Sequence, residues 1–297
     1  MTDRSLPAEV PRSRRPEAGV RSNESVAALP LLSRTPTPGL RSVGLAGLVG
    51  VALVVAGCGT GTGDDGPTLD VLAAASLGGV MERVVSEFEA EHPGVRVRLS
   101  VAGSPDLVAQ VVQGAPADVL ATADEATMAR VTSDPSLRTS RPQVFATNTP
   151  ALVVSSDAGP AADAVRSLDD AAAPGVRLVV CDPAVPCGDA AVRLAEAAGV
   201  ELRPVSEELR VTDVLAKVTG GEADAGIVYA TDAAAALARE PGAVRVVDVP
   251  EAAAVVNRYP VTVLEDSPEA DLAHAFVATL TGPGGRVVLD EAGFGVP

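Results

Sequence analysis

The feature that most constrains the fold of this 297-residue chain is a regular alternation of strand and helix patterns over residues 71–124. Apolar runs and alternating apolar residues are typical of strands, whereas a one-sided apolar stripe is typical of an amphipathic helix. The segments read strand, helix, strand, helix, strand at residues 69–75, 77–88, 95–101, 107–113 and 118–123. This order predicts an α/β fold built on a parallel sheet.

A serine stands at each of the first two strand-to-helix junctions. Ser76 ends the run Ala-Ala-Ala-Ser, and Ser104 follows the second strand in Ala-Gly-Ser-Pro-Asp. The backbone N–H groups that open a helix have no partner within it, and a serine hydroxyl adds a further donor. Two such junctions side by side on a parallel sheet would form a socket for a small oxyanion. Ordinary helix capping is the alternative interpretation of both serines.

A second series of α/β segments follows Pro150 without repeating the first by residue identity. Strands are predicted at residues 151–155, 176–181, 225–229, 244–249 and 259–264, and helices at 189–198, 211–218, 232–239, 269–281 and 284–292. Two series followed by a tail indicate two lobes, with the tail returning to the first. We expect one lobe at residues 68–148 plus 247–297 and the other at 149–246, with hinge crossings near 148–151 and 246–249.

The N-terminal region has the features of an export signal. Residues 1–41 have the composition of a disordered leader, and residues 42–57 are an apolar run, short for a membrane-spanning helix. The run ends in Val-Val-Ala-Gly-Cys58, which resembles the lipobox of bacterial lipoproteins. The resemblance implies a signal peptide at residues 1–57, lipidation of Cys58 and anchoring to the outer face of the cell membrane. Residues 58–67 would be a flexible tether. An uncleaved membrane anchor is the alternative.

Composition and charge argue against several classes of function. Aromatic residues make up 2% of the chain and the net charge is −16, which disfavours nucleic-acid binding and stacking on bases or sugars. His92 and His274 alone make no metal cluster. Ser104 is not in a G-x-S-x-G turn, and the sole lysine, Lys217, is not in a phosphate loop. We therefore expect a binding protein without cofactor or catalytic residues. An exported hydrolase that uses Ser104 is the alternative.

The other two cysteines are close together in the sequence. Five residues, two of them prolines, separate Cys181 from Cys187. In an exported protein the oxidising environment favours a disulfide, which would close a small loop. Two free buried thiols are the alternative, and a metal site is disfavoured because two ligands without a nearby histidine do not suffice.

Several short motifs occur in an order typical of one family. They read Ala73-Ala-Ala-Ser76-Leu, Gln113-Gly-Ala-Pro-Ala-Asp118-Val, Ala123-Asp124, Val185-Pro-Cys-Gly188 and Gly226-Ile-Val-Tyr229. In their order and spacing, residues 68–297 resemble the molybdate-binding proteins of ABC importers. The resemblance implies a two-lobed periplasmic-binding-protein fold, with a largely parallel sheet flanked by helices in each lobe. It also implies a monomer that closes on an oxyanion and works with the permease and the ATPase of an ABC transporter.

The resemblance further implies which residues contact the oxyanion. The hydroxyl donors would be Ser76, Ser104 and Tyr229, and the backbone N–H donors would be Cys187 and Val211. Cys187 stands where the family usually has alanine, and the sequence around Val211 departs from the family pattern. For Tyr229, a core position with a satisfied hydroxyl is the alternative.

These residue types agree with a fully ionised ligand. Molybdate is a dianion that only accepts hydrogen bonds, and the five implied ligands include no acidic residue. Phosphate still carries a proton near neutral pH and would favour a site with an acceptor. We therefore expect a preference for molybdate or tungstate over phosphate. A receptor for sulfate or another oxyanion, and the effector-sensing domain of a regulator, are alternatives.

Overall fold

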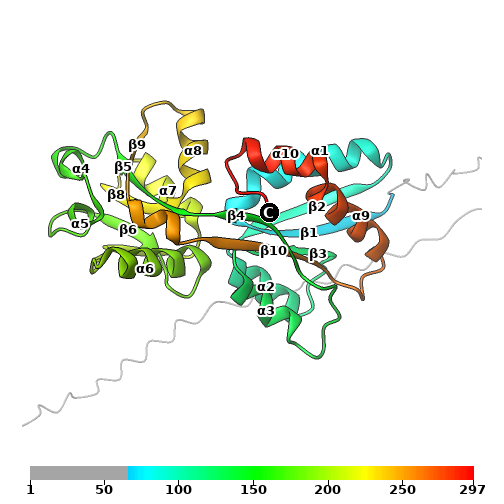
Figure 1. Ribbon diagram of the computed structural model, residues 1–297. Helices are drawn as coiled ribbons and strands as arrows, with labels where there is room; N and C mark the ends of the chain where they lie inside the picture. The colour runs from blue at the N-terminus through cyan, green and yellow to red at the C-terminus, as the bar shows by residue number, and fades with distance from the viewer. Residues whose placement is uncertain (1–65) are drawn as a thin grey trace, which may run out of the picture. The chain divides into compact units, whose positions relative to one another are not determined.

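The computed structural model describes residues 66–297, which form two five-stranded sheets with helices packed on both faces (Figure 1). The predicted signal peptide, the lipidation site Cys58 and residues 58–65 of the predicted tether lie outside the described residues. Among residues 66–297, no helix is both long and apolar enough to cross a membrane.

The first sheet combines strands from both ends of the described chain, in the order β2-β1-β3-β10-β4. The strands are β1 (Thr68–Ala74), β2 (Arg96–Ala102), β3 (Val119–Ala121), β4 (Gln143–Asn148) and β10 (Asn257–Val263). Strand β1 runs parallel to β2 and β3, whereas β10 runs antiparallel to β3 and β4.

Helices cover both faces of this sheet because its side chains alternate between two cores. On β1, Val71 and Ala73 belong to one apolar cluster and Leu72 belongs to the other. The first cluster includes residues of α1 (Gly78–Glu91), α9 (Ala270–Thr281) and α10 (Pro283–Glu291); the second includes α2 (Ser104–Val112) and α3 (Glu125–Thr132). A short 3₁₀ turn, η1 (Ala75–Leu77), connects β1 to α1. The buried stripe of α1 follows the predicted helical period at Val80, Met81, Val84 and Phe88.

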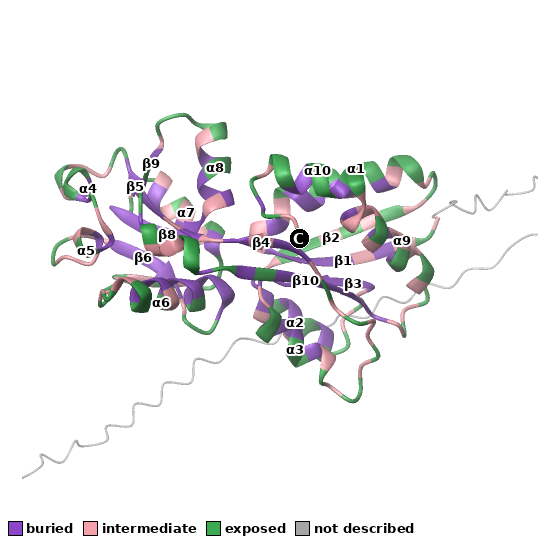
Figure 2. Cartoon of the chain, viewed as in Figure 1, coloured by how far each residue is buried: buried purple, intermediate pink, exposed green. Residues whose placement is uncertain are grey.

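The second sheet has the order β7-β6-β8-β5-β9 and the same pattern of directions as the first. Its strands are β5 (Pro150–Ser155), β6 (Leu178–Cys181), β7 (Ser206–Glu208), β8 (Ala225–Tyr229) and β9 (Val244–Val247). The helices of this lobe are α4 (Pro160–Ala164), α5 (Leu168–Ala171), α6 (Pro186–Ala198), α7 (Val211–Thr219), α8 (Ala230–Arg239) and the 3₁₀ helix η2 (Pro250–Ala254). In both sheets the inner strands are buried, whereas the outer faces of the helices are exposed (Figure 2).

Each sheet is largely parallel, as predicted, because four of its five strands run in one direction, although the fifth strand makes two antiparallel pairings. One strand in each sheet is reversed: β10 in the first and β5 in the second. Both follow a crossing from the other lobe, so the chain enters the sheet from the hinge side. The apolar pattern of a strand carries no information on direction, so the sequence did not predict the reversal.

The first crossing lies where it was predicted, between Asn148 and Pro150, but the second lies later than predicted. The chain returns at Val255–Asn257 rather than near residues 246–249, because Val249 and Val255 are buried in the core of the second lobe together with η2. Residues 247–255 therefore belong to the second lobe and not to the first. Asn257 pairs with Asn148, so the two crossing strands are hydrogen-bonded neighbours.

Candidate functional site

The five predicted ligand residues follow the ends of equivalent parallel strands in the two lobes. Ser76 and Ser104 follow β1 and β2 of the first sheet. In the second sheet Cys187 and Val211 follow β6 and β7, and Tyr229 ends β8. Because the carboxyl ends of parallel strands meet at one edge of a sheet, each lobe presents its residues along one edge.

All five residues line one cavity, which has a volume of about 20 Å³. Organic ligands usually occupy pockets of about 300–1,000 Å³, so this cavity suits a small inorganic ion better than a sugar or a peptide. Its lining among the described residues contains no Asp, Glu, Lys or His. The structure therefore brings together the five residues that the sequence predicted, in surroundings without charged side chains.

Helix N-termini surround the cavity. Ser104 opens α2, Val211 opens α7, Cys187 lies in the first turn of α6 and Tyr229 precedes α8. The backbone N–H groups of a first helical turn have no partner within their helix, and the helix dipole adds positive potential there. The site therefore offers backbone donors and positive potential to an anion without any cationic side chain.

Ser104 is buried and its hydroxyl has a defined direction. Its Oγ accepts a hydrogen bond from the backbone N–H of Ala123, at 3.1 Å. Since a backbone N–H can only donate, the Ser104 proton remains available for another acceptor. Ser76 Oγ lies 3.1 Å from the hydroxyl of Tyr259, and either oxygen can be the donor there.

Two buried tyrosines near the cavity, Tyr229 and Tyr259, remain protonated. Burial raises the pKa of Tyr229 and of Tyr259 well above the usual tyrosine range. The two rings pack edge to face with centroids 6.0 Å apart. Both hydroxyls therefore stay neutral at physiological pH and can donate hydrogen bonds.

Asp232 is the acidic group that lies behind Tyr229, in the first turn of α8. Its carboxylate accepts the backbone N–H of Tyr229 at 3.2 Å and so caps the helix. Burial raises the pKa of Asp232 to about 7, although this hydrogen bond acts in the opposite direction. Its protonation therefore changes within the physiological pH range.

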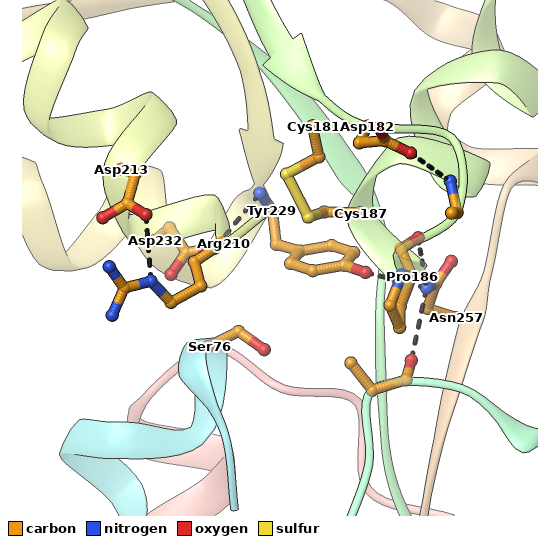
Figure 3. The surroundings of a disulfide bond; sticks show 12 residues. Ser76, Cys181, Asp182, Pro186, Cys187, Arg210, Asp213, Tyr229, Asp232 and Asn257 are labelled. Carbon is orange, nitrogen blue, oxygen red and sulfur yellow. Dashed lines mark hydrogen bonds and ion pairs between the residues drawn. A yellow bond between two sulfur atoms is a disulfide. The ribbon is translucent and has the colours of Figure 1, made fainter. Parts of the chain in front are cut away.

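The predicted disulfide between Cys181 and Cys187 is present in the structure (Figure 3). The two Cα atoms are 5.6 Å apart, and the bond ties the end of β6 to the first turn of α6. The bond also restrains Cys187, one of the cavity residues.

Reduction of this disulfide is expected to lower the free energy of unfolding by about 2 kcal/mol, because closing a short loop restricts the unfolded chain. Urea unfolding with and without a reductant would measure the difference. The matched control is the double variant Cys181→Ala/Cys187→Ala, whose stability should not respond to the reductant. An equal response of both proteins would contradict the prediction.

The structure adds residues that the sequence did not indicate. Asn257, 2% exposed, donates from its side-chain amide to the Tyr229 hydroxyl at 2.8 Å (Figure 3). Tyr259 and Asp232 also support the site and were predicted only as parts of a strand and a helix. No local motif marks these residues, because their roles depend on neighbours far away in the sequence.

Asp118, Asp124 and Asp224 each have a structural partner outside the cavity. Asp124 caps α3 by accepting the N–H of Thr127 at 2.7 Å. Asp118 accepts from Ser267, and Asp224 forms an ion pair with Arg177. None of the three lines the cavity. Within residues 66–297, no group of three or more His, Cys, Asp or Glu residues could hold a metal ion.

The chain forms two lobes that are joined by two crossing segments, and residues of both lobes line one small cavity. This arrangement defines a two-lobed solute-binding protein. Residues 69–295 match the family model of bacterial extracellular solute-binding proteins, and the chain belongs to this family. Molybdate-binding protein ModA of Mycobacterium tuberculosis is 44% identical over 270 residues, which cover 87% of this chain and 100% of that protein.

Further similarities support the same family and fold. Molybdate-binding protein ModA of Escherichia coli is 32% identical over 255 residues, covering 82% of this chain and 95% of that protein. The periplasmic molybdate-binding protein of Azotobacter vinelandii has a similar structure, with a TM-score of 0.64 and 22% identity over 77% of this chain and 99% of that chain. The family resemblance and the two-lobed α/β fold expected from the motifs are therefore confirmed.

Proposed function

We propose that this protein captures molybdate outside the cytoplasm and delivers it to an ABC importer. The observation that carries the proposal is the convergence of five donor residues, from two lobes, on one small cavity. The identity of 44% to a molybdate-binding protein, over the whole length of that protein, supports the choice of ligand.

The chemistry of the cavity favours a fully ionised tetrahedral anion. Its hydroxyl and backbone N–H groups can donate hydrogen bonds to the oxygens of such an ion. Phosphate would in addition present a proton, and no carboxylate among the described lining residues is available to accept it. We therefore infer a preference for molybdate, or tungstate of similar size and charge, over phosphate.

Binding would proceed by closure of the two lobes. Ser76 and Ser104 come from the first lobe, whereas Cys187, Val211 and Tyr229 come from the second. An anion that contacts both sets stabilises the closed state by its higher affinity for that state. The chain between β4 and β5 and the chain between η2 and β10 would accommodate the motion.

Calorimetric titration of residues 66–297 with molybdate, tungstate, sulfate and phosphate at neutral pH tests the proposal. We expect binding of molybdate and tungstate, and no displacement of molybdate by phosphate at equal concentration. Displacement by phosphate would contradict the donor-only interpretation of the site. Tight binding of sulfate alone would instead identify a sulfate receptor.

The substitution Ser76→Ala is expected to weaken molybdate binding by about 1–3 kcal/mol, or roughly 5- to 150-fold in Kd, through loss of a hydrogen bond to a charged ligand. Calorimetry measures the change. The matched control is Ser100→Ala, since Ser100 is exposed on β2 and does not line the cavity. An unchanged Kd in the Ser76 variant would remove this residue from the site.

The alternative of an exported serine hydrolase has less support. The Ser104 hydroxyl receives a hydrogen bond from the Ala123 N–H, whereas a nucleophilic serine donates to a base. Among the described residues, the cavity lining contains no histidine or lysine that could act as that base. The proposal needs neither a cofactor nor a catalytic residue.

The proposal also covers how the protein is held at the membrane and which transport proteins receive its ligand. We infer that Cys58 is lipidated and holds the monomeric protein at the outer face of the membrane, where a permease and its ATPase receive the ligand. The lipobox-like sequence before Cys58 supports this interpretation. Labelling of cells with a fatty-acid analogue should modify the natural chain and not its Cys58→Ala variant.

A further inference from the structure

Asn257 occupies a distinctive position between the lobes. It is the first residue of β10, immediately after the return crossing, and it is 2% exposed. Across the strand pair it lies opposite Asn148, the last residue of β4. The side chain of each asparagine donates to a hydroxyl of the second lobe: Asn148 to Thr231 and Asn257 to Tyr229, both at 2.8 Å.

The partners of Asn257 define the orientation of its side-chain amide. Its Nδ2 lies 3.2 Å from the carbonyl oxygen of Ala123 and 3.3 Å from that of Pro186, and both oxygens can only accept. Its Oδ1 accepts a hydrogen bond from the guanidinium of Arg193, which can only donate. The opposite assignment of nitrogen and oxygen would place acceptors against acceptors and donors against donors, so it is excluded.

This orientation decides the role of the Tyr229 hydroxyl. The amide Nδ2 that faces Tyr229 Oη at 2.8 Å has hydrogens and no lone pair for accepting. The phenol oxygen therefore accepts from Asn257, and its own proton is left for another acceptor: the Tyr259 hydroxyl when the cavity is empty, or an anion in the cavity. Tyr229 lines the cavity, as does Ser104, whose hydroxyl is oriented in the same way by the Ala123 N–H.

We propose that Asn257 is a positioning residue that directs the Tyr229 hydroxyl proton into the cavity and so makes this tyrosine a donor to the oxyanion. The inference rests on the proposed function. Asn257 does not line the cavity, so it acts on the ligand only through the Tyr229 oxygen. Without Asn257, the phenol could donate its proton to a neighbouring carbonyl instead.

A double-mutant cycle in molybdate affinity tests the inference. Asn257→Ala is expected to weaken binding about tenfold when Tyr229 is present, because an oriented hydrogen bond to a charged ligand is lost. In the Tyr229→Phe background the same substitution should change Kd less than about twofold, since no hydroxyl is left to orient. Asn257→Ser, which retains a polar group, runs through the same cycle if the alanine variant does not fold.

The matched control is Asn148→Ala, the other asparagine of the pair, whose side chain contacts the hydroxyls of Thr231 and Tyr259 and not that of Tyr229. Its effect should be the same with Tyr229 or with Phe at that position. Additive effects of Asn257 and Tyr229 substitutions, or no effect of Tyr229→Phe, would overturn this inference while leaving the proposed function intact. Failure of the unsubstituted protein to bind any oxyanion would overturn both.

Discussion

Replacement of Gly188 by alanine is expected to lower the free energy of unfolding by about 3 kcal/mol, at the upper end of the range for overpacked sites. A Cβ at this position would overlap the backbone carbonyl of Asp182 and would lie 2.7 Å from the carbonyl oxygen of Cys181. Backbone atoms cannot rotate away as a flexible side chain can. The first turn of α6 would therefore have to move away from the end of β6.

The same substitution is expected to weaken molybdate binding by about ten- to a hundredfold, because the proposed donor, the Cys187 N–H, would be displaced from the cavity. Urea unfolding and calorimetry measure the two effects. Gly79→Ala is the matched control, since Gly79 also lies in the first turn of a helix near the site, but a Cβ added there would meet nothing within 4 Å. That variant should bind normally and gain about 0.5–1 kcal/mol of stability. Similar behaviour of the two variants would contradict the steric argument.

The second large effect concerns pH and Asp232. Its pKa of about 7 in the folded protein exceeds the usual aspartate value of 3.8, so the folded state holds this proton more tightly than the unfolded state does. Stability should therefore fall as pH rises from about 4 to about 7 and level off above, by an amount on the order of 4 kcal/mol.

Comparison of Asp232→Asn with the natural chain isolates this contribution. The asparagine can still accept the Tyr229 N–H but carries no charge, so the variant should be more stable than the natural chain at pH 8 and similar to it at pH 4. Thermal unfolding across this range measures the difference. Asp189→Asn, a change at an exposed first-turn carboxylate of α6, should retain the natural pH profile. Parallel pH profiles of the Asp232 variant and the natural chain would contradict the prediction.

The sequence predicted most of the elements that carry the site, because their patterns are local. The apolar run of β1, the helical stripe of α1 and the apolar strand β8 each reflect burial against neighbouring elements. The five cavity residues were predicted from the family motifs, and these motifs lie next to strand ends, where a parallel fold gathers its residues.

Other features were not predicted, because no local sequence pattern encodes them. Strand β7 is the polar segment Ser-Glu-Glu at a sheet edge, and only its backbone pairing with β6 makes it a strand. Strand β4 mixes polar and apolar residues and was not predicted. The return crossing was placed too early, since burial of Val249 and Val255 depends on packing in the second lobe. Asn257 was missed because it acts through partners distant in the sequence.

The reversed strand β10 has a consequence for the order in which the chain can fold. It is the link between β3 and β4, so without it β4 has no neighbour in its sheet. The second lobe is continuous from β5 to η2 and can form its core as soon as that segment is available. The first lobe must wait until Val263 has been synthesised, and α9 and α10 follow later still. Assembly of the first lobe is therefore late and non-local, and non-local pairing of this kind slows folding.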